Sequence, residues 1–436
     1  MNNIKVALVC DWLTGIGGAE RVVLELHKMF PDAPIYTSQY DPGRIDWFAG
    51  ADVRTTWLQK LPSALKKFLP VLRAWSFSRL NLSEYDLVIS TGGAEAKFIK
   101  TSPNKHSRFS QLFGAQGANE ERKGNVHVST TSAHRSLQHS DPDKSIGGVI
   151  GSADEQANTV RKCVHVYYCY APVHYYWSRY DEYMQNPGFG AFNWLARMGL
   201  KMLVGPMRRW DYKAAQRPDF IIGISSHIQK EIKKYYGRKA ALIHPPVDTS
   251  RFQKAKSPQP SVLSPPLSPR HGFVTAGRQA PYKRHDLAVA ACTKLNLPLT
   301  VIGNGPEHDK LVKMAGPTVK FVTNASDADV ARYFVEAEAF IFPGLDDFGI
   351  VAVEAMASGT PVIAFRSGGA IDYVIPGKTG EFFIEQTVES LVQTLKTFNS
   401  DDFNREDIVA NSKAFSSDKF QSNMREFLSN TLSHLS

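Results

Sequence analysis

The stretch that decides the fold is IFPGLDDFGIVAVEAMASGTPVI, residues 341–363. Its first residues predict an apolar strand that ends at Pro343-Gly344, and a helix that contains Glu354 follows. A second apolar strand begins after the break at Gly359-Thr360-Pro361. Strand, helix and strand in this order predict one unit of a parallel α/β sheet.

The turn of this unit combines two kinds of polar group. In a doubly wound sheet, ligands bind where the strands end and a helix begins. The free backbone N–H groups at such a helix start favour a phosphate. Asp346 and Glu354, eight residues apart, supply carboxylates that accept hydrogen bonds from hydroxyls. Hydroxyls together with phosphate describe a nucleotide sugar.

The same segment resembles the Glu-x7-Glu region of retaining GT-B glycosyltransferases of family 4, in particular their bacterial mannosyltransferase-like branch. The match covers Phe348-Gly349-Ile350, Glu354-Ala-Met-Ala and Gly359-x-Pro361-Val-Ile, with Asp346 at the position of the first family glutamate. The resemblance implies that Asp346 contacts donor-sugar hydroxyls, with Asp347 able to share this task, and that Glu354 contacts the ribose. It also implies that Phe348, Gly349 and Ile350 present backbone amides to the sugar and phosphate.

Strand and helix patterns alternate on both sides of this motif and predict an α/β chain with two Rossmann-like domains. The resemblance implies the GT-B arrangement, in which the two domains face a central cleft. Four segments are predicted: an acceptor-side domain over 1–250, a Pro/Ser linker or loop over 251–271, a domain that binds the nucleotide sugar over 272–410, and a C-terminal helix over 411–436 that crosses back to the first domain.

Residues 103–160 interrupt the first domain with a polar stretch rich in Ser, His, Gly, Asn and Gln. Loops of this length are uncommon inside compact domains. We favour a disordered insertion, and a regulatory lid or an artefact of translation or gene prediction are the alternatives.

Two cations follow the first predicted strand of the second domain. Arg278 and Lys283 lie five residues apart in a loop at the strand end. Such a pair can hold two phosphates, because Arg offers a planar fork and Lys a compact charge. In the family, the matching residues neutralise the diphosphate leaving group. The resemblance therefore implies catalysis without a metal or other cofactor, whereas two surface cations at a helix start are the structural alternative.

Glycine-rich turns and one amide complete the expected donor site. Gly303 and Gly305 resemble a family turn that lets the backbone approach the nucleotide, and Asn324 lies where relatives contact the base. Gly17 and Gly18 resemble the loop of the first domain that approaches the diphosphate. Each of these glycine pairs is also compatible with an ordinary tight turn.

The chain departs from the family at Tyr170, where relatives have an active-site histidine; His174 follows four residues later. Tyrosine is a poor general base near pH 7. In the front-face mechanism proposed for retaining transferases, the departing phosphate accepts the acceptor's proton, so the substitution does not exclude catalysis. We place Tyr170 and His174 among the catalytic candidates.

The net charge of +9 is compatible with nucleic acid, an anionic membrane surface or phosphorylated substrates. No nucleic-acid-binding module is visible. Residues 57–75 and 201–213 mix Trp, Leu and Lys or Arg, a composition that suits docking on anionic lipid as well as ordinary surface helices. No apolar run predicts a membrane span or a signal peptide, and the four cysteines are expected to be reduced. We therefore expect a cytoplasmic protein, with a peripheral position on the cytoplasmic face of the membrane as the alternative.

Together, the motifs predict a retaining glycosyltransferase that needs no metal and acts in polysaccharide biosynthesis. The resemblance suggests mannose from GDP-mannose as the donor sugar and a polysaccharide or lipid-linked glycan as the acceptor. Two other functions are open: a non-catalytic partner that binds the donor or is recruited to a membrane, and a sugar-nucleotide 2-epimerase of the same fold.

Overall fold

A computed structural model describes residues 4–62, 70–101, 163–185, 187, 190–254 and 270–433. All of these residues belong to one compact unit, formed by Met1–Thr101 and Cys163–Ser436. The predicted insertion at 103–160, residues 63–69 of the first basic stretch and residues 255–269 of the predicted linker lie outside the described residues.

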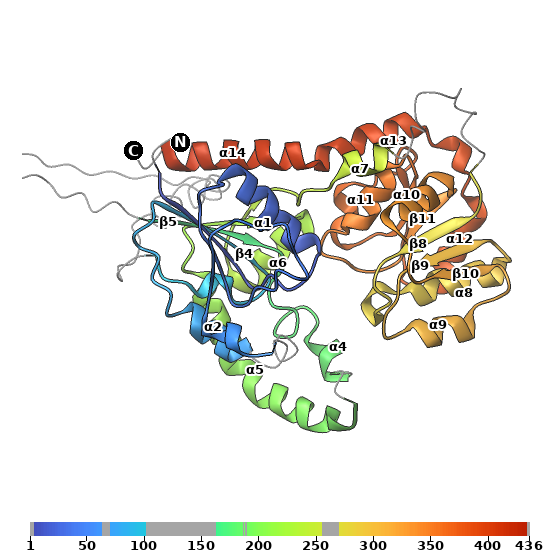
Figure 1. The fold of residues 1–436 in the computed structure, drawn as a ribbon. Helices are drawn as coiled ribbons and strands as arrows, with labels where there is room; N and C mark the ends of the chain where they lie inside the picture. The colour runs from blue at the N-terminus through green and yellow to red at the C-terminus, as the bar shows by residue number, and fades with distance from the viewer. Residues whose placement is uncertain are drawn as a thin grey trace, which may run out of the picture. The chain divides into compact units, whose positions relative to one another are not determined.

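The first half of the chain forms a sheet of seven parallel strands in the order β3-β2-β1-β4-β5-β6-β7 (Figure 1). Its central strands β1, β4 and β5 are buried along their whole length, as expected for a parallel sheet with helices on both faces. The strands are β1 Val6–Cys10, β2 Ile35–Thr37, β3 Val53–Thr55, β4 Leu87–Gly92, β5 Val164–Cys169, β6 Phe220–Gly223 and β7 Ala241–Leu242.

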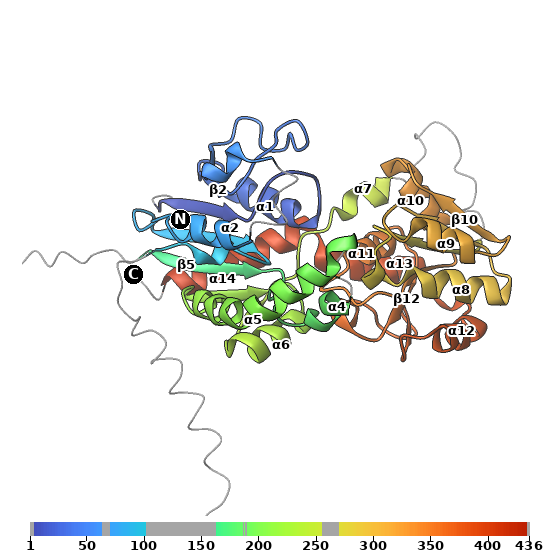
Figure 2. The same ribbon diagram turned by 90° about the horizontal axis from the view of Figure 1, so that it is seen from below.

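The second half forms a sheet of six parallel strands in the order β10-β9-β8-β11-β12-β13 (Figure 2). These strands are β8 Phe273–Ala276, β9 Leu299–Ile302, β10 Val319–Val322, β11 Ala339–Phe342, β12 Val362–Phe365 and β13 Gly380–Phe383. The α/β fold with two Rossmann-like sheets is therefore confirmed.

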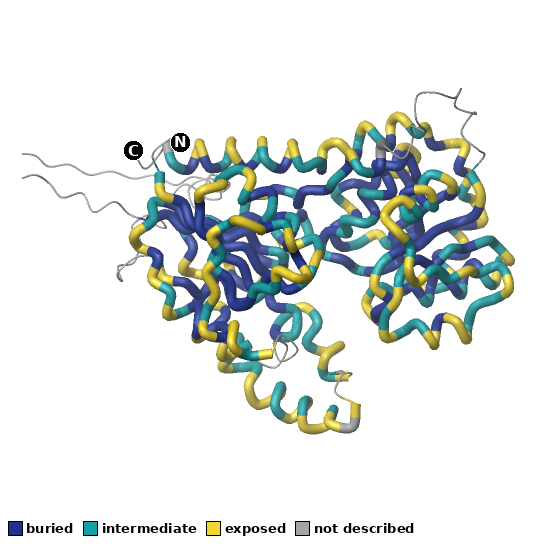
Figure 3. The backbone as a smooth tube through the Cα atoms, in the orientation of Figure 1, coloured by how far each residue is buried: buried dark blue, intermediate teal, exposed yellow. Residues whose placement is uncertain are grey.

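The helices connect the strands and cover the sheets, so that the dark-blue buried backbone in Figure 3 follows the strands. Their starts are set by local chemistry: Ser225 caps α6, and Ser326 and Asp329 form a capping box on α10. The α-helices are α1 Gly18–Met29, α2 Pro70–Phe77, α4 Tyr180–Gln185, α5 Asn193–Ala215, α6 Ser226–Tyr236, α7 Thr249–Lys254, α8 His285–Leu295, α9 His308–Met314, α10 Asp327–Glu336, α11 Ile350–Ala357, α12 Val388–Thr397, α13 Arg405–Ser412 and α14 Ser417–Ser433. Short 3₁₀ turns are η1 Trp57–Lys60, η3 Ala96–Phe98, η4 Gly190–Phe192, η5 Pro281–Lys283, η6 Gly368–Asp372, η7 Ser400–Asp402 and η8 Lys413–Phe415.

The last helix, α14, packs on elements of the first sheet (Figure 1). Its Phe420 ring lies 5.8 Å from the ring of Tyr168, and Gln421 donates a hydrogen bond of 2.7 Å to Glu25 of α1. The sequence predicts one helix from Asn411, but the structure breaks it before Ser417. At the break, Ser416 pairs with Val247 as an isolated bridge, which redirects the backbone out of the helix.

Part of the predicted linker is ordered structure that belongs with the second half. Residues 251–254 lie in α7, where the Phe252 ring stacks on Phe334 at 5.9 Å and Arg251 pairs with Asp327 at 2.8 Å. Arg270 donates hydrogen bonds to the carbonyl oxygens of Gly359 and Phe403. The prediction of a linker or loop is therefore wrong for residues 251–254, which are helical, and Arg270 lies in a loop that is bound to the second half.

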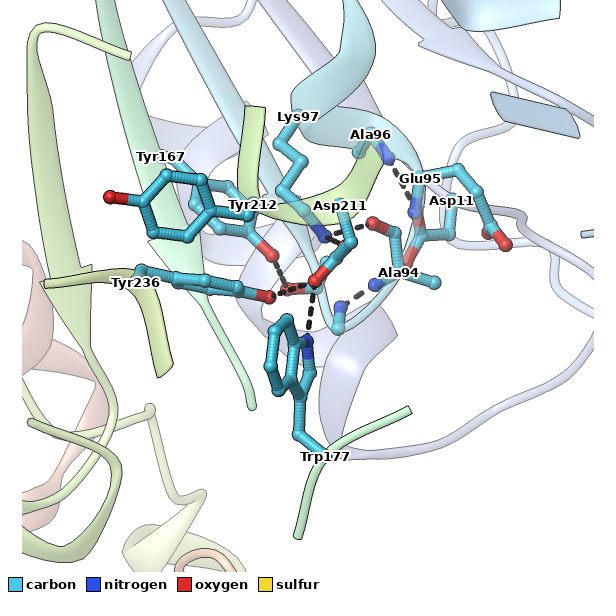
Figure 4. A network of polar contacts seen from close by, with 12 residues as sticks. Asp11, Ala94, Glu95, Ala96, Lys97, Tyr167, Trp177, Asp211, Tyr212 and Tyr236 are labelled. Atoms are coloured by element: carbon cyan, nitrogen blue, oxygen red, sulfur yellow. Dashed lines mark hydrogen bonds and ion pairs between the residues drawn. The ribbon is translucent and has the colours of Figure 1, made fainter. Parts of the chain in front are cut away.

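A polar network is buried beneath the first sheet (Figure 4). Lys97 is fully buried and pairs with Asp211 of α5 at 2.8 Å. The same carboxylate accepts hydrogen bonds from the Trp177 indole at 2.8 Å and the Tyr236 hydroxyl at 2.9 Å. These contacts join η3, α5 and α6, and they keep the charged Asp211 compensated inside the protein.

Lys97→Met should lower the free energy of unfolding by about 3–5 kcal/mol, because it leaves the Asp211 carboxylate buried without its cation. Urea denaturation measures the loss. The double variant Lys97→Met/Asp211→Asn should be more stable than the single one, whereas the exposed control Lys310→Ala should change stability by less than about 0.5 kcal/mol. Equal losses for Lys97→Met and Lys310→Ala would contradict a structural role for the buried pair.

Candidate active site

Each sheet has one point where its strand order reverses, and ligands bind at such points in doubly wound folds. In the first sheet this point lies between β1 and β4, and in the second it lies between β8 and β11. The loop after β8 carries Arg278 and Lys283, and the loop after β11 carries Asp346 and Asp347. The topology thus brings together residues that are more than sixty positions apart in the sequence.

Lys283 and Asp346 form an ion pair across the reversal point of the second sheet. Gly344 permits this approach, since a Cβ atom there would lie 3.0 Å from the Lys283 backbone. Burial disfavours the lysine's charge, but the Asp346 carboxylate outweighs it and holds the pKa of Lys283 above its ordinary value. Arg278, five residues earlier, is exposed.

Asp346 retains one unused hydrogen-bond acceptor. Its side chain is buried, and its Oδ1 atom has no hydrogen-bond partner among the described residues. A buried oxygen without a partner costs free energy unless a ligand supplies a donor. This oxygen is therefore suited to accept a hydrogen bond from a ligand hydroxyl.

Asp347 points to a different partner from its neighbour. Its Oδ2 lies 2.9 Å from Nε2 of His174, whose Nδ1 lies 2.9 Å from the Ser178 hydroxyl. Burial disfavours the charged carboxylate, but the hydrogen bond from His174 and the nearby cations outweigh it, so the pKa of Asp347 lies below its ordinary value. The two adjacent acids thus serve separate partners, one on each half of the chain.

A cavity of about 330 Å³ lies at the reversal point of the first sheet and includes Asp347 in its wall. Asp11, directly after β1, forms part of this wall. Its carboxylate accepts hydrogen bonds of 2.7–3.2 Å from the backbone N–H groups of residues 93–96, which fixes the loop after β4. The other lining residues are Cys10, Trp12, Ala19, Glu20, Val23, Thr91, Gly93, Ala94, Tyr170, Ala171, Val173, His174, Tyr175 and Tyr183.

The start of helix α11 leaves backbone N–H groups for a ligand. Gly349 occupies its N-cap with φ of 92°, a conformation that favours glycine, and no side chain caps this terminus. A Cβ atom on Gly349 would also lie 2.5 Å from the Phe342 ring. The glycine loop of the first half lies against this terminus, since a Cβ atom on Gly18 would lie 2.5 Å from Cδ1 of Ile350.

Glu354 differs from Asp347 because the effect of burial on its pKa exceeds the effect of the charges around it. Its Oε1 lies 3.7 Å from Arg251, and 13% of its side chain is exposed. Burial raises the pKa of Glu354 to about 7, although the charges of Arg251 and Arg21 oppose the shift. The carboxyl group therefore changes its charge near neutral pH.

The remaining candidates are placed less directly at the site. The Tyr170 hydroxyl donates a hydrogen bond of 3.0 Å to the Ala19 carbonyl, and burial raises the pKa of this tyrosine well above its ordinary value. Gly303 and Gly305 let their loop approach the backbone of Gly277 and Gln279. Of the three remaining candidates, Asn324 is exposed, the Phe348 ring is buried, and Gly17 lies in the loop before α1.

Arg179 and Arg251 also contact the motif, although the sequence analysis did not select them. Arg179 donates a hydrogen bond of 2.7 Å to the Leu345 carbonyl, and Arg251 pairs with Glu354. Asp11 lines the same cavity as Asp347 and was not predicted either, although its place directly after the first buried strand was an available signal. No motif or residue spacing in the sequence pointed to Arg179 or Arg251.

The described ranges contain neither a metal-binding cluster nor a helix that could span a membrane. No group of three or more His, Cys, Asp or Glu side chains there is arranged to hold a metal ion. No helix there has the length and apolar character needed to cross a bilayer. The absence of a metal requirement stays a prediction.

Comparisons with known proteins support the resemblance. Residues 268–415 match the family described as glycosyl transferases group 1. A GDP-mannose-dependent alpha-(1-6)-phosphatidylinositol monomannoside mannosyltransferase from Mycolicibacterium smegmatis is 31% identical over 188 residues, which are 37% of this chain and 48% of that protein. A GDP-mannose-dependent alpha-mannosyltransferase from the same organism is 36% identical over 118 residues, which are 27% of this chain and 31% of that protein. These matches span about half or less of the curated relatives.

Solved structures extend the likeness in fold to nearly the whole chain. Anabaena HepE in complex with UDP has a TM-score of 0.58 and 16% identity, and the match covers 98% of this chain and all of that one. Sucrose-phosphate synthase from Thermosynechococcus elongatus has a TM-score of 0.57 and 16% identity, with 99% and 100% covered. The predicted GT-B fold is confirmed.

Glu354→Gln should stabilise the protein above pH 7, because the wild-type carboxylate is ionised there in a setting that disfavours its charge. The unfolded state loses this proton near pH 4.3 and the folded state near pH 7, so wild-type stability falls as the pH rises through this window. Urea denaturation should show a gain for the variant that is larger at pH 8 than at pH 5 by about 2 kcal/mol. The exposed control Glu385→Gln should show no such difference, and an equal effect of Glu354→Gln at both pH values would contradict the shift.

Proposed function

Because residues 268–415 match glycosyl transferases group 1 and the chain has the GT-B fold, we propose that this protein is a retaining glycosyltransferase that needs no metal. The proposed donor is GDP-mannose, and the proposed acceptor is a polysaccharide or lipid-linked glycan. The observation that carries the proposal is the Lys283–Asp346 pair at the sheet's reversal point, with an unpartnered Asp346 oxygen and with the exposed Arg278 in the same loop as Lys283.

The cations and the helix start suit the diphosphate. Lys283 holds its charge, Arg278 is exposed, and the uncapped N-terminus of α11 offers backbone N–H groups nearby in the same motif. In the proposed reaction the bond between sugar C1 and the phosphate oxygen breaks. These groups then stabilise the negative charge that develops on the departing phosphate.

The acids suit hydroxyl groups. Asp346 Oδ1 is available to accept from a sugar hydroxyl, and Glu354 is the proposed acceptor for a ribose hydroxyl. A bond forms between the acceptor oxygen and C1 on the face that the phosphate leaves, and the acceptor's proton passes to the departing phosphate. This path needs no protein base, which agrees with the engagement of the Tyr170 hydroxyl by Ala19.

Support for mannose comes from sequence relatives whose names specify GDP-mannose. The fold neighbour HepE was solved with UDP, so the nucleotide has to be tested directly. We propose a thermal-shift panel with GDP-mannose, GDP, UDP-glucose, UDP-GlcNAc and UDP. Stabilisation by the guanosine compounds alone supports the proposed donor, and stabilisation by the uridine compounds alone overturns it.

Activity separates transfer from the two other functions considered. Nucleotide release that requires a glycan acceptor and yields an α-linked mannosyl product supports a retaining transferase. Donor binding without turnover on any glycan or lipid-linked acceptor supports a non-catalytic partner. Conversion of the sugar nucleotide to its 2-epimer, without transfer, supports an epimerase.

Lys283→Ala should weaken binding of the stabilising nucleotide at least about tenfold, since it removes a charge-assisted contact with phosphate. Isothermal titration calorimetry measures the affinity. The double variant Lys283→Met/Asp346→Asn also removes the charge of the lysine, but it leaves no unpaired buried carboxylate. Lys310→Ala on α9 is the matched control. Unchanged affinity in both Lys283 variants would exclude this lysine from the donor site.

A further inference from the structure

Helix α5 exposes its apolar side chains instead of burying them. Trp194 and Met202 are among the most exposed large apolar residues, with 64% and 71% of their surface exposed. The adjoining Phe192 of η4 is 68% exposed. None of the described residues from 192 to 210 is buried, and the first buried residue of α5 is Asp211 (Figure 3).

The exposed residues share one face of the helix. At about 100° per residue, Leu195, Met198 and Met202 lie on one stripe, and Arg209 and Lys213 continue it. Soluble helices usually direct such an apolar stripe toward the core. Here the stripe faces away from it, so this face of α5 has an apolar surface that lacks a partner within the described chain.

The charge on this face has one sign. Lys201, Arg209 and Lys213 are exposed and form no ion pair with the described residues. The acid of α5, Asp211, is buried and paired with Lys97. An apolar stripe flanked by free cations is complementary to an anionic interface with an apolar interior.

A second apolar group lies close to the first. Trp57 and Trp75 contact each other at 6.1 Å between ring centroids and are 45% and 41% exposed, and Val71 and Leu72 of α2 are also exposed. Helices α2 and α5 line one small pocket together, so they are neighbours (Figure 1). Tryptophan at such a surface suits the boundary between lipid headgroups and acyl chains.

The structure also shows which residues of the predicted docking stretch 201–213 face away from the surface. Arg208 turns inward, where its guanidinium lies 5.4 Å from the Trp177 ring and donates to the Tyr176 carbonyl. Trp210 packs on Phe98 at 4.9 Å. The docking stretch predicted from the sequence is therefore wrong for these two residues, and the exposed apolar part lies earlier, at 192–203.

We propose that the outward face of α5, residues 192–213, together with the exposed side chains of α2, docks this protein on an anionic lipid bilayer. The docking face adjoins the cavity at the first sheet. Arg197 of α5 donates to the carbonyls of Met184 and Gln185 at the end of α4, and Tyr183 of α4 lines the cavity. A bilayer bound to α5 would thus lie next to this cavity of the first half, the half predicted to be on the acceptor side; a role for the cavity in holding a lipid-linked acceptor rests on the proposed function.

Vesicle co-sedimentation of the full chain tests the docking without reference to transfer. We expect binding to phosphatidylcholine vesicles that contain phosphatidylglycerol, and little binding to phosphatidylcholine alone or at high salt. Trp194→Ser/Met202→Ser should weaken binding at least about tenfold. Lys201→Glu/Arg209→Glu replaces two cations and should weaken vesicle binding at least about 25-fold, which is about fivefold for each cation.

Matched controls carry the same changes elsewhere. Ile375→Ser/Ile384→Ser replaces exposed apolar residues of the second half, and Lys396→Glu/Lys419→Glu reverses exposed lysines of α12 and α14. Both controls should bind vesicles like the wild type, and all variants should keep the wild-type thermal shift with nucleotide.

Three outcomes would overturn the proposal. The first is equal binding of the wild type to neutral and anionic vesicles. The second is an equal loss of vesicle binding in the α5 variants and in their controls. The third is a wild type that binds no vesicles and forms a dimer in light scattering, which Trp194→Ser/Met202→Ser converts to a monomer. The last result would assign the face to a second copy of the chain. A failure of nucleotide binding, by contrast, would leave this test unaffected.

Discussion

The ion pair between Lys283 and Asp346 is the interaction on which the candidate site depends. It joins the loops after β8 and β11, the two strands between which the order of the second sheet reverses. Lys283 is largely buried, and the Asp346 carboxylate beside it holds the pKa of the lysine above its ordinary value. The pair therefore holds a lysine charge and an unpartnered carboxylate oxygen at one place, which are the groups that the proposed function assigns to the phosphate and to a sugar hydroxyl.

Glycines make this arrangement possible at points where side chains would not fit. Gly344 lies against the Lys283 backbone, and Gly349 turns the chain into α11. Gly18 lies against Ile350, so the loops of the two halves that are proposed to enclose the diphosphate already contact each other. A donor that enters between them has to displace this contact, and domain opening is a common way to do so.

Polar contacts between the two halves surround the same place. His174 bonds to Asp347, and the Ser226 amide and His244 bond to Asp372 in η6. Most of these groups come from strand ends or helix starts, where the backbone leaves side chains free to reach across. These hydrogen bonds link the first half of the chain to the loops after β11 and β12.

Much of the fold could be predicted from the sequence, because buried parallel strands produce continuous apolar runs. The predicted strand before Pro343-Gly344, the helix that contains Glu354 and the strand after Gly359-Thr360-Pro361 are present as β11, α11 and β12. The break before α14 could not be predicted, since it follows from the pairing of Ser416 with Val247, far away in the sequence.

The site was predictable to the extent that its residues belong to short motifs. Asp346, Glu354 and Lys283 came from such motifs, and the structure brings Lys283 and Asp346 together. The partners of Glu354 and Asp347 depend on tertiary packing that no local pattern records. The same limit applies to the direction of side chains, as the inward turn of Arg208 illustrates.

The most direct test of the central claim is a crystal structure of the protein with GDP-mannose. The account predicts the diphosphate within hydrogen-bond distance of Arg278, Lys283 and the N-terminus of α11, with a sugar hydroxyl on Asp346. A nucleotide bound elsewhere, or a diphosphate held by a metal ion while Lys283 and Asp346 bind only each other, would contradict it.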